Sequence, residues 1–228
     1  MAIMEEKKII IFTGPSLPPK DAQKVLKADY RGPVGRDDII TALKDKTDII
    51  GIIDGVFHQQ PAVSHKELLK ALKSGVIIVG GASMGALRAS ELDDFGMIGV
   101  GKVYEAYKNG DIESDDDVAV AFNPDTMEQL SEALVNITYN FQKAYIKGLI
   151  CKSELEILLK IAKSIYYPKR TYKQIINNSN INFQKKTSLE TFLEKEAKDI
   201  KREDALLVLK CIKRIKKKIE ISADVRKK

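Results

Sequence analysis

A serine set among small residues is the chemically most suggestive feature of the sequence. Ser83 lies in Gly81-Ala-Ser-Met-Gly85, which fits the G-x-S-x-G pattern of a nucleophile elbow between a strand and a helix. In such an elbow the N–H of the next residue, here Met84, stabilises the oxyanion that forms when the serine attacks a carbonyl carbon. A serine that only tightens a turn fits the same short pattern. Both interpretations, nucleophile and turn residue, therefore remain open.

The elements around Ser83 are those that an elbow requires. The apolar run 76–79 predicts a buried strand before it, and the apolar spacing up to Leu92 predicts a helix after it. Similar apolar runs at 7–13 and 48–54 predict two more buried strands, with helical segments in between. Alternating strands and helices predict an α/β fold, with a mainly parallel sheet, flanking helices and a Rossmann-like core. Ligand sites of such sheets lie at the carboxyl ends of the strands, so we expect the loops beginning at Gly14, Asp54 and Gly81 to converge.

The pattern changes after residue 124. A further strand is predicted at 118–122, and from Met127 to Tyr145 apolar residues recur at spacings of three and four, which predicts one long amphipathic helix. More helices are predicted over 153–165, 172–176, 189–198 and 203–219. We therefore expect an α/β catalytic core over residues 1–124 and a helical, basic region over residues 125–228.

The composition is that of a soluble globular protein, with 44% hydrophobic and 31% charged residues. Two distant cysteines, Cys151 and Cys211, and only two histidines, His58 and His65, predict no metal site. We also expect no cofactor. Reduced thiols and the lack of an apolar leader indicate a cytoplasmic protein. No apolar stretch approaches the roughly 18 residues of a membrane span.

The net charge of +6 is unevenly distributed, since acidic residues prevail up to residue 150 and basic residues beyond it. The lysine-rich segment 213–219 is compatible with attraction to nucleic-acid phosphates. It lacks interleaved aromatic residues and any base-reading motif, so binding of an acidic protein partner or improved solubility explains it equally well. We expect no nucleic-acid partner.

Several motifs in order resemble the TfuA-like family over roughly the first 125 residues. They are Phe12-Thr-Gly-Pro-Ser16, Ile53-Asp-Gly-Val-Phe57, His65-Lys-Glu67, Gly81-Ala-Ser-Met-Gly-Ala-Leu-Arg-Ala-Ser-Glu-Leu92, Phe95-Gly-Met97, Gly99-Val-Gly101 and Asp115-Asp-Asp-Val-Ala-Val120. The resemblance implies a role in peptide-backbone thioamidation beside a YcaO-type, ATP-dependent enzyme. It implies hydrolysis of a thiocarboxylated ubiquitin-like sulfur carrier, which releases sulfide, and help for the partner in engaging its peptide or protein substrate. The archaeal branch of the family is similar to an accessory for thioglycine formation in methyl-coenzyme M reductase.

The resemblance also implies a Ser–Lys catalytic pair, in which the serine corresponds to Ser83. For the lysine we favour Lys66, because it lies in His65-Lys-Glu67 on the predicted helix before the strand that leads to Ser83. On the other interpretation, Lys66 belongs to a solvated helix face. Lys102, directly after the loop 99–101, is the competing candidate.

Other residues near these motifs are expected to support the reaction or bind substrate. Asp54 is expected to orient the lysine or contact substrate, or else to cap the next turn, and an amide from Gly14 to Ser16 is a further candidate oxyanion donor. Arg88 is a candidate for binding the carrier's carboxylate or for pairing with Glu91. The acidic run 115–117 is interpreted as a solvated loop rather than a binding site for a cation or basic partner.

Two alternatives to the Ser–Lys hydrolase remain open. A Ser-His-Asp arrangement could use His65 or His58 together with Asp54. A non-catalytic adaptor would instead activate the YcaO-type enzyme and dock its peptide or its sulfur carrier, without any chemical role for Ser83.

Overall fold

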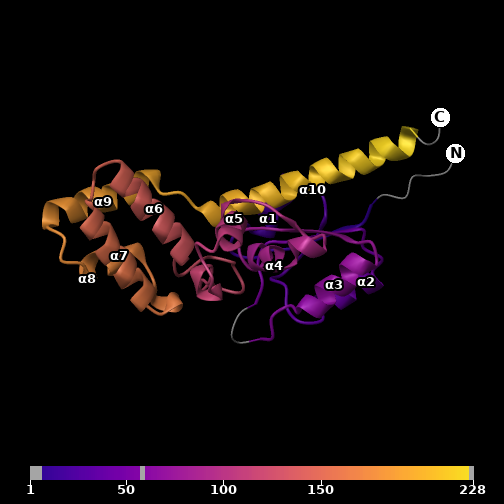
Figure 1. The fold of residues 1–228 in the computed structure, drawn as a ribbon, viewed down its shortest axis with the longest axis horizontal. Helices are drawn as coiled ribbons and strands as arrows, with labels where there is room; N and C mark the ends of the chain where they lie inside the picture. The colour runs from indigo at the N-terminus through magenta and orange to yellow at the C-terminus, as the bar shows by residue number, and fades with distance from the viewer. Residues whose placement is uncertain (1–6, 57–59, 226–228) are drawn as a thin grey trace. The chain divides into compact units, whose positions relative to one another are not determined.

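A five-stranded parallel sheet forms the centre of the α/β part of the chain (Figure 1). The computed structural model describes residues 7–56 and 60–225. The strands are β1 (Ile9–Phe12), β2 (Asp29–Arg31), β3 (Ile49–Ile52), β4 (Ile77–Gly80) and β5 (Ile98–Gly99). They lie in the order β2-β1-β3-β4-β5, and each neighbouring pair is parallel. The predicted α/β fold with a mainly parallel sheet is confirmed.

The strand order creates a switch point between β1 and β3. From β1 the chain moves to β2 on one side and then returns to β3 on the other side. The loops that follow β1 and β3 therefore begin next to each other at the carboxyl edge of the sheet. Open α/β sheets bind their ligands at such a position.

Helices cover both faces of the sheet. They are α1 (Pro19–Ala22), α2 (Asp38–Lys44), α3 (His65–Lys73), α4 (Met84–Leu92), α5 (Lys102–Asn109) and α10 (Ile200–Val225), with a 3₁₀ turn η1 (Asp93–Phe95). Successive side chains of a strand point to opposite faces. Ile10 and Phe12 join a core with α2, α3 and α4, whereas Ile9 and Ile11 join a second core with α1 and α10. Burial on both faces explains why these strands are continuously apolar.

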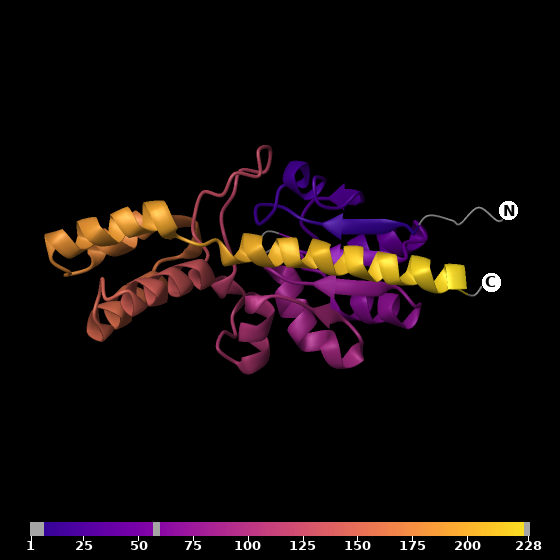
Figure 2. The ribbon, with the colours of Figure 1, turned by 90° about the horizontal axis from the view of Figure 1, so that it is seen from above.

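The last helix, α10, belongs to the core of the sheet. Ala205, Val208 and Ile212 of α10 share a buried cluster with Ile11 of β1 and Val79 of β4. Figure 2 shows α10 running alongside the strands, starting at the end toward which the strand arrows point. From the sequence, this helix was expected to belong to the helical region 125–228. Its apolar side instead covers sheet residues that would otherwise be exposed to water.

The chain forms two compact units, residues 1–113 with 201–228 and residues 114–200. The second unit contains α6 (Leu134–Ile146), α7 (Lys152–Ser164), α8 (Tyr172–Asn178) and α9 (Phe183–Glu196), with 3₁₀ turns η2 (Asp115–Asp117) and η3 (Tyr167–Lys169). Its core includes Phe141, Leu158 and Ile175. Asp116, from the acidic run, pairs with the buried Arg170, so one of these carboxylates stabilises this unit.

Two local predictions were wrong, both in the segment before α6. Residues 118–122 form no strand: Val118 and Ala119 are buried in an irregular segment, and only a single bridge joins Phe122 to Gln129. The predicted helix from Met127 begins only at Leu134. Met127, where the helical pattern begins, has a left-handed φ of 60°, which an α-helix cannot contain.

Candidate active site

Ser83 lies on a tight turn between β4 and α4. Ala82, immediately before it, has a left-handed φ of 69°, which is unfavourable for a residue with a β-carbon. The surrounding backbone holds this conformation, because the Ser83 N–H donates to Ile53 O at 3.2 Å and to Gly81 O at 2.9 Å. The G-x-S-x-G pattern therefore forms a strand–turn–helix elbow.

The two glycines of the pattern are required by close packing. A β-carbon on Gly85 would lie 1.8 Å from the carbonyl oxygen of Ile52, and one on Gly81 would lie 2.7 Å from the carbonyl oxygen of Val100. Both distances are far inside van der Waals contact. The glycines thus allow α4 and the turn to approach the backbone of the adjacent strands.

The Ser83 hydroxyl is available for chemistry. The residue is only 2% exposed, yet its side chain does not cap α4 and makes no hydrogen bond within the described part of the chain. Each fully buried side-chain oxygen and nitrogen of the described residues has a partner, so the Ser83 hydroxyl must keep contact with solvent. A hydroxyl of this kind can be reached by a substrate carbonyl without first breaking a protein hydrogen bond.

Met84 provides the first N–H of α4, and no acceptor for it is found among residues 7–56 and 60–225. The first N–H groups of a helix point outward and carry the positive end of its dipole. Since α4 starts directly after Ser83, this amide is suited to stabilising negative charge on an oxygen attached to the carbon that Ser83 attacks. The expected role of Met84 as an oxyanion donor stays a prediction with this geometric support.

Asp54 binds the loop after β1. Its Oδ2 accepts the N–H groups of Gly14 at 2.8 Å and Ser16 at 3.1 Å, and its Oδ1 accepts the Ser16 hydroxyl at 2.6 Å. Asp54 is 3% exposed, so these bonds join the two loops of the switch point inside the protein. The amides of Gly14 and Ser16 are consequently engaged rather than free to bind an oxyanion.

The motif His65-Lys-Glu67 begins α3. Glu67 forms a capping box with Ser64 and also accepts a hydrogen bond from the Asp37 N–H at 2.8 Å. Its carboxylate therefore has a structural role. His65 Nε2 lies 2.8 Å from Glu91 Oε2, toward the far end of α4 from Ser83. This imidazole nitrogen is therefore engaged away from the hydroxyl that it would have to deprotonate, and His58 lies outside the described residues.

Lys66, the favoured base, is exposed on α3, and no described residue accepts a hydrogen bond or ion pair from its ammonium group.

Arg88 donates to Val63 O at 3.2 Å and pairs with Glu91 at 2.7 Å. The helix-surface pairing expected for Arg88 is thus present. The contacts of His65 and Arg88 with Glu91, and of Arg88 with Val63, thus link the start of α3 to the second half of α4.

Lys102 is exposed at the start of α5, and its backbone N–H donates to Asp204 Oδ1 at 3.0 Å. The N–H of Val103 donates to Asp204 Oδ2 at 2.8 Å. Asp204, on α10, thus caps α5 from a distant part of the sequence, and Gly101 leaves the space for it, since a β-carbon there would lie 2.2 Å from Asp204 Cγ. Asp204 was not predicted as a functional residue, because an acidic residue next to Glu203 in a basic helix has no distinctive local pattern.

Burial raises the pKa of Asp204 to about 6, although its two backbone hydrogen bonds act in the opposite direction. The folded state therefore retains the proton better than the unfolded state, and stability contributed by this group is lost as the pH rises from about 4 to about 6.

We expect the free energy of unfolding of the wild type, relative to Asp204→Asn, to fall by on the order of 3 kcal/mol between pH 4 and pH 7. Urea unfolding of both proteins across this range measures the difference, and the other carboxylates cancel in the comparison. An equal pH dependence of the two proteins would contradict the raised pKa.

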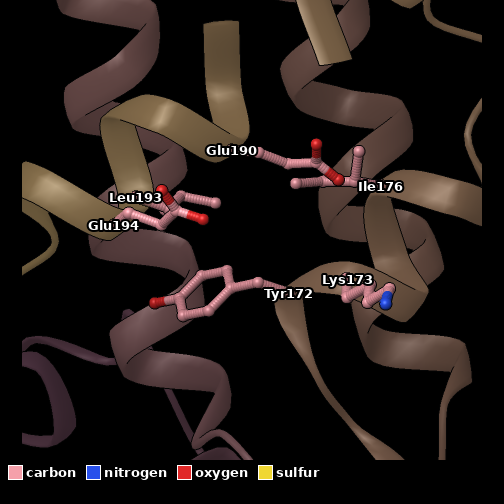
Figure 3. Close-up of a pocket in the computed structure, with 6 residues that line it drawn as sticks. All are labelled: Tyr172, Lys173, Ile176, Glu190, Leu193 and Glu194. Atoms are coloured by element: carbon pink, nitrogen blue, oxygen red, sulfur yellow. The ribbon is translucent and has the colours of Figure 1, made fainter. Parts of the chain in front are cut away.

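A separate hollow of about 450 Å³ lies in the unit formed by residues 114–200. Figure 3 shows its lining from α8 and α9, namely Tyr172, Lys173, Ile176, Glu190, Leu193 and Glu194. Tyr172 is fixed by a hydrogen bond from Asn140 at 2.8 Å and by an edge contact with Phe141. The lining contains no serine or cysteine, so this hollow offers a binding surface rather than a nucleophile.

Neither a membrane-spanning helix nor a metal-binding cluster is found in the part of the chain that the structure describes. No helix there combines the length and apolar character needed to cross a bilayer. No three His, Cys, Asp or Glu side chains within the same residues form a group able to hold a metal ion.

Comparison with protein-family models places part of the chain in a known family. A family model described as "TfuA-like protein" matches residues 54–171, just over half of the chain. The matched segment includes Asp54 and the elbow with Ser83. A search of curated proteins found no match.

Proposed function

Since the chain belongs to the TfuA-like protein family, we propose that it releases hydrosulfide from a thiocarboxylated ubiquitin-like sulfur carrier during peptide-backbone thioamidation. The released sulfur would serve a YcaO-type, ATP-dependent enzyme, which converts a backbone amide of its peptide or protein substrate into a thioamide. Thioglycine formation in methyl-coenzyme M reductase is one reaction of this class.

The proposed chemistry is acyl transfer through Ser83. Its Oγ attacks the carbonyl carbon of the carrier's C-terminal thiocarboxylate, and the C–S bond breaks. The serine proton passes by way of a base to the departing sulfur, which leaves as HS⁻. Water then hydrolyses the resulting ester, and this step returns the serine hydroxyl and leaves the carrier with an ordinary carboxylate.

The observation that carries the proposal is the state of the Ser83 hydroxyl. It lies at a closely packed elbow, has no hydrogen-bond partner in the described structure, and keeps contact with solvent beside the first N–H of α4. A serine that served only the turn would be expected to cap the helix. The absence of a cap therefore favours the nucleophile over the turn residue.

The test is to incubate the purified protein with a carrier ending in a thiocarboxylate and to measure hydrosulfide together with the mass of the carrier. We expect each carrier to lose its sulfur, replaced by one oxygen, at a rate far above that without protein. Rapid acid quenching should trap a fraction of the protein with the carrier attached through Ser83. A carrier that keeps its sulfur in the presence of both this protein and the YcaO-type enzyme would reject the hydrolase.

The same assay separates the hydrolase from the adaptor. An adaptor would stimulate thioamidation by the YcaO-type enzyme when free sulfide is supplied, and would do so equally well without a hydroxyl at residue 83. A hydrolase is needed only when sulfur is supplied as the thiocarboxylate. Comparing the two sulfur sources, with and without this protein, therefore distinguishes the two functions.

A further inference from the structure

The outer side of α10 carries a row of basic side chains. One side of the helix packs on the sheet through Ala205, Val208 and Ile212 (Figure 2), and the side chains on its opposite side are exposed. Basic residues recur there at spacings of three and four, so they lie together along the helix. We call this row the basic stripe, and its exposed members are Lys210, Lys213, Arg214, Lys217 and Lys218.

No carboxylate within the described residues neutralises the basic stripe. Its ammonium and guanidinium groups make neither an ion pair nor a hydrogen bond with residues 7–56 or 60–225. Residues 205–219 contain no Asp or Glu, and Glu220 pairs with Lys216 instead. Like charges three or four residues apart on a helix repel one another. A helix surface that served solubility alone would relieve this repulsion by mixing charges of both signs.

The opposite charge is concentrated before α6. From Asn109 to Gln142 the chain contains no Lys or Arg. We call residues 111–130 the acidic segment. Several of its carboxylates are exposed and form no ion pair or hydrogen bond with the residues that the structure describes, namely Asp111, Glu113, Asp115, Asp125 and Glu128. The chain therefore bears two exposed surfaces of opposite charge, and neither is compensated within its described part.

The acidic segment has a defined structure. Arg170 pairs with Asp116, and its carbonyl oxygen accepts the N–H of Glu132 at 2.7 Å. Between these two points, a bridge joins Phe122 to Gln129. These contacts fix the segment within the unit of residues 114–200, so its exposed carboxylates form a surface rather than a loose tail. The sequence had favoured a solvated loop for the run 115–117.

Exposed apolar side chains accompany both charged surfaces. Leu207 and Ile221 lie on the same side of α10 as the basic stripe, and Leu130 ends the acidic segment. Exposed ion pairs contribute little affinity by themselves, whereas buried apolar area is the main favourable contribution to protein association. Charges mainly decide which surfaces meet and how they are aligned. A protein partner therefore fits the stripe better than a nucleic acid, for which stacking aromatic residues would be expected.

We propose that the basic stripe of one molecule binds the acidic segment of a second copy of this chain. The second copy supplies the unpaired carboxylates and the exposed Leu130 that the stripe lacks, and it receives the cations that its own acidic segment lacks. In a two-fold dimer this contact occurs twice. An unrelated acidic protein would compensate only the stripe. The inference does not rest on the proposed function, because neither Ser83 nor a sulfur carrier takes part in the contact.

The first measurement is the mass of the full-length protein in solution, by light scattering over a dilution series. We expect a dimer at about 0.1 M salt. Its dissociation constant should rise about 10-fold or more at about 1 M salt, because the screening length falls from about 10 Å to about 3 Å. A protein that is monomeric throughout, or a dimer that salt does not weaken, would overturn the proposal.

Charge reversal on each surface identifies the contact. Lys213→Glu with Lys217→Glu makes the stripe acidic, and Asp125→Lys with Glu128→Lys makes the acidic segment basic. Each double variant alone should dimerise about 100-fold or more weakly, since attraction becomes repulsion. An equimolar mixture of the two should form a heterodimer of near wild-type stability, because both of its contacts again join opposite charges. Circular dichroism checks that each variant is folded.

Lys70→Glu with Lys73→Glu is the charge-matched control. These exposed lysines lie on α3, which covers the other face of the sheet, so this variant should dimerise like the wild type. Equal weakening by the control, no weakening by either reversal, or a mixture that stays monomeric would each reject the contact. A single-stranded DNA oligonucleotide that binds a monomeric wild type, but not the stripe variant, would assign the stripe to nucleic acid instead.

Discussion

Ser83→Ala should reduce hydrosulfide release from the thiocarboxylated carrier by about 10³-fold or more, since removing a nucleophile abolishes the acyl-enzyme route. The fold should be unaffected. The Ser83 hydroxyl makes no hydrogen bond to a described residue, so we expect a change in unfolding free energy of less than about 1 kcal/mol. Initial rates of hydrosulfide release and urea unfolding measure the two effects.

Ser90→Ala provides the matched control, because Ser90 lies on the same helix and its hydroxyl donates to Leu87 O at 2.7 Å. This variant should keep wild-type hydrosulfide release. A Ser83→Ala protein that is folded and releases hydrosulfide at the wild-type rate would remove the nucleophile from the mechanism. It would leave the adaptor as the better account of this protein.

Gly85→Ala should lower the unfolding free energy by about 3 kcal/mol or more and abolish activity as well. The added β-carbon would lie 1.8 Å from the carbonyl oxygen of Ile52, and backbone on both sides leaves no flexible side chain to yield. Overpacking of a close-packed interior commonly costs 1–3 kcal/mol, and a clash with backbone lies at the upper end. Chemical denaturation and the hydrosulfide assay test the prediction.

Gly32→Ala is the control for this substitution. A β-carbon on Gly32 would meet nothing within 4 Å, so that variant should be as stable and active as the wild type, within about 0.5 kcal/mol. Equal stability of the Gly85→Ala and Gly32→Ala proteins would show that α4 can move away from β3. The elbow would then not be held as rigidly as its packing indicates.

The buried strands could be predicted because both faces of a parallel sheet are covered, which leaves continuous apolar runs such as 48–54. The segment 118–122 has the same apolar character but forms no strand, since Val118 and Ala119 are buried without a neighbouring strand to pair with. The apolar character of a segment indicates that it is buried, whereas strand pairing depends on which other segments lie beside it in the fold. The start of α6 was misplaced because Met127, at which the apolar pattern begins, has a left-handed φ of 60° and so cannot belong to a helix.

The candidate site was predicted in part. The elbow follows from local sequence, since small residues at Gly81 and Gly85 are needed wherever a strand turns sharply into a helix. Asp54 could be recognised as a polar residue after a predicted strand, but its partners, Gly14 and Ser16, are some 40 residues away in sequence. No local pattern indicates that its carboxylate joins two loops rather than contacting a substrate.

By itself, the sequence determined the parallel α/β architecture, the family and the strand–turn–helix around Ser83, because each is encoded in short runs of neighbouring residues. The tertiary structure alone decided where α10 packs and hence which lysine is buried. Lys201 and Lys66 look alike in sequence, as single lysines in amphipathic helices. Lys201 is 1% exposed whereas Lys66 is exposed, and this difference depends on contacts between segments far apart along the chain.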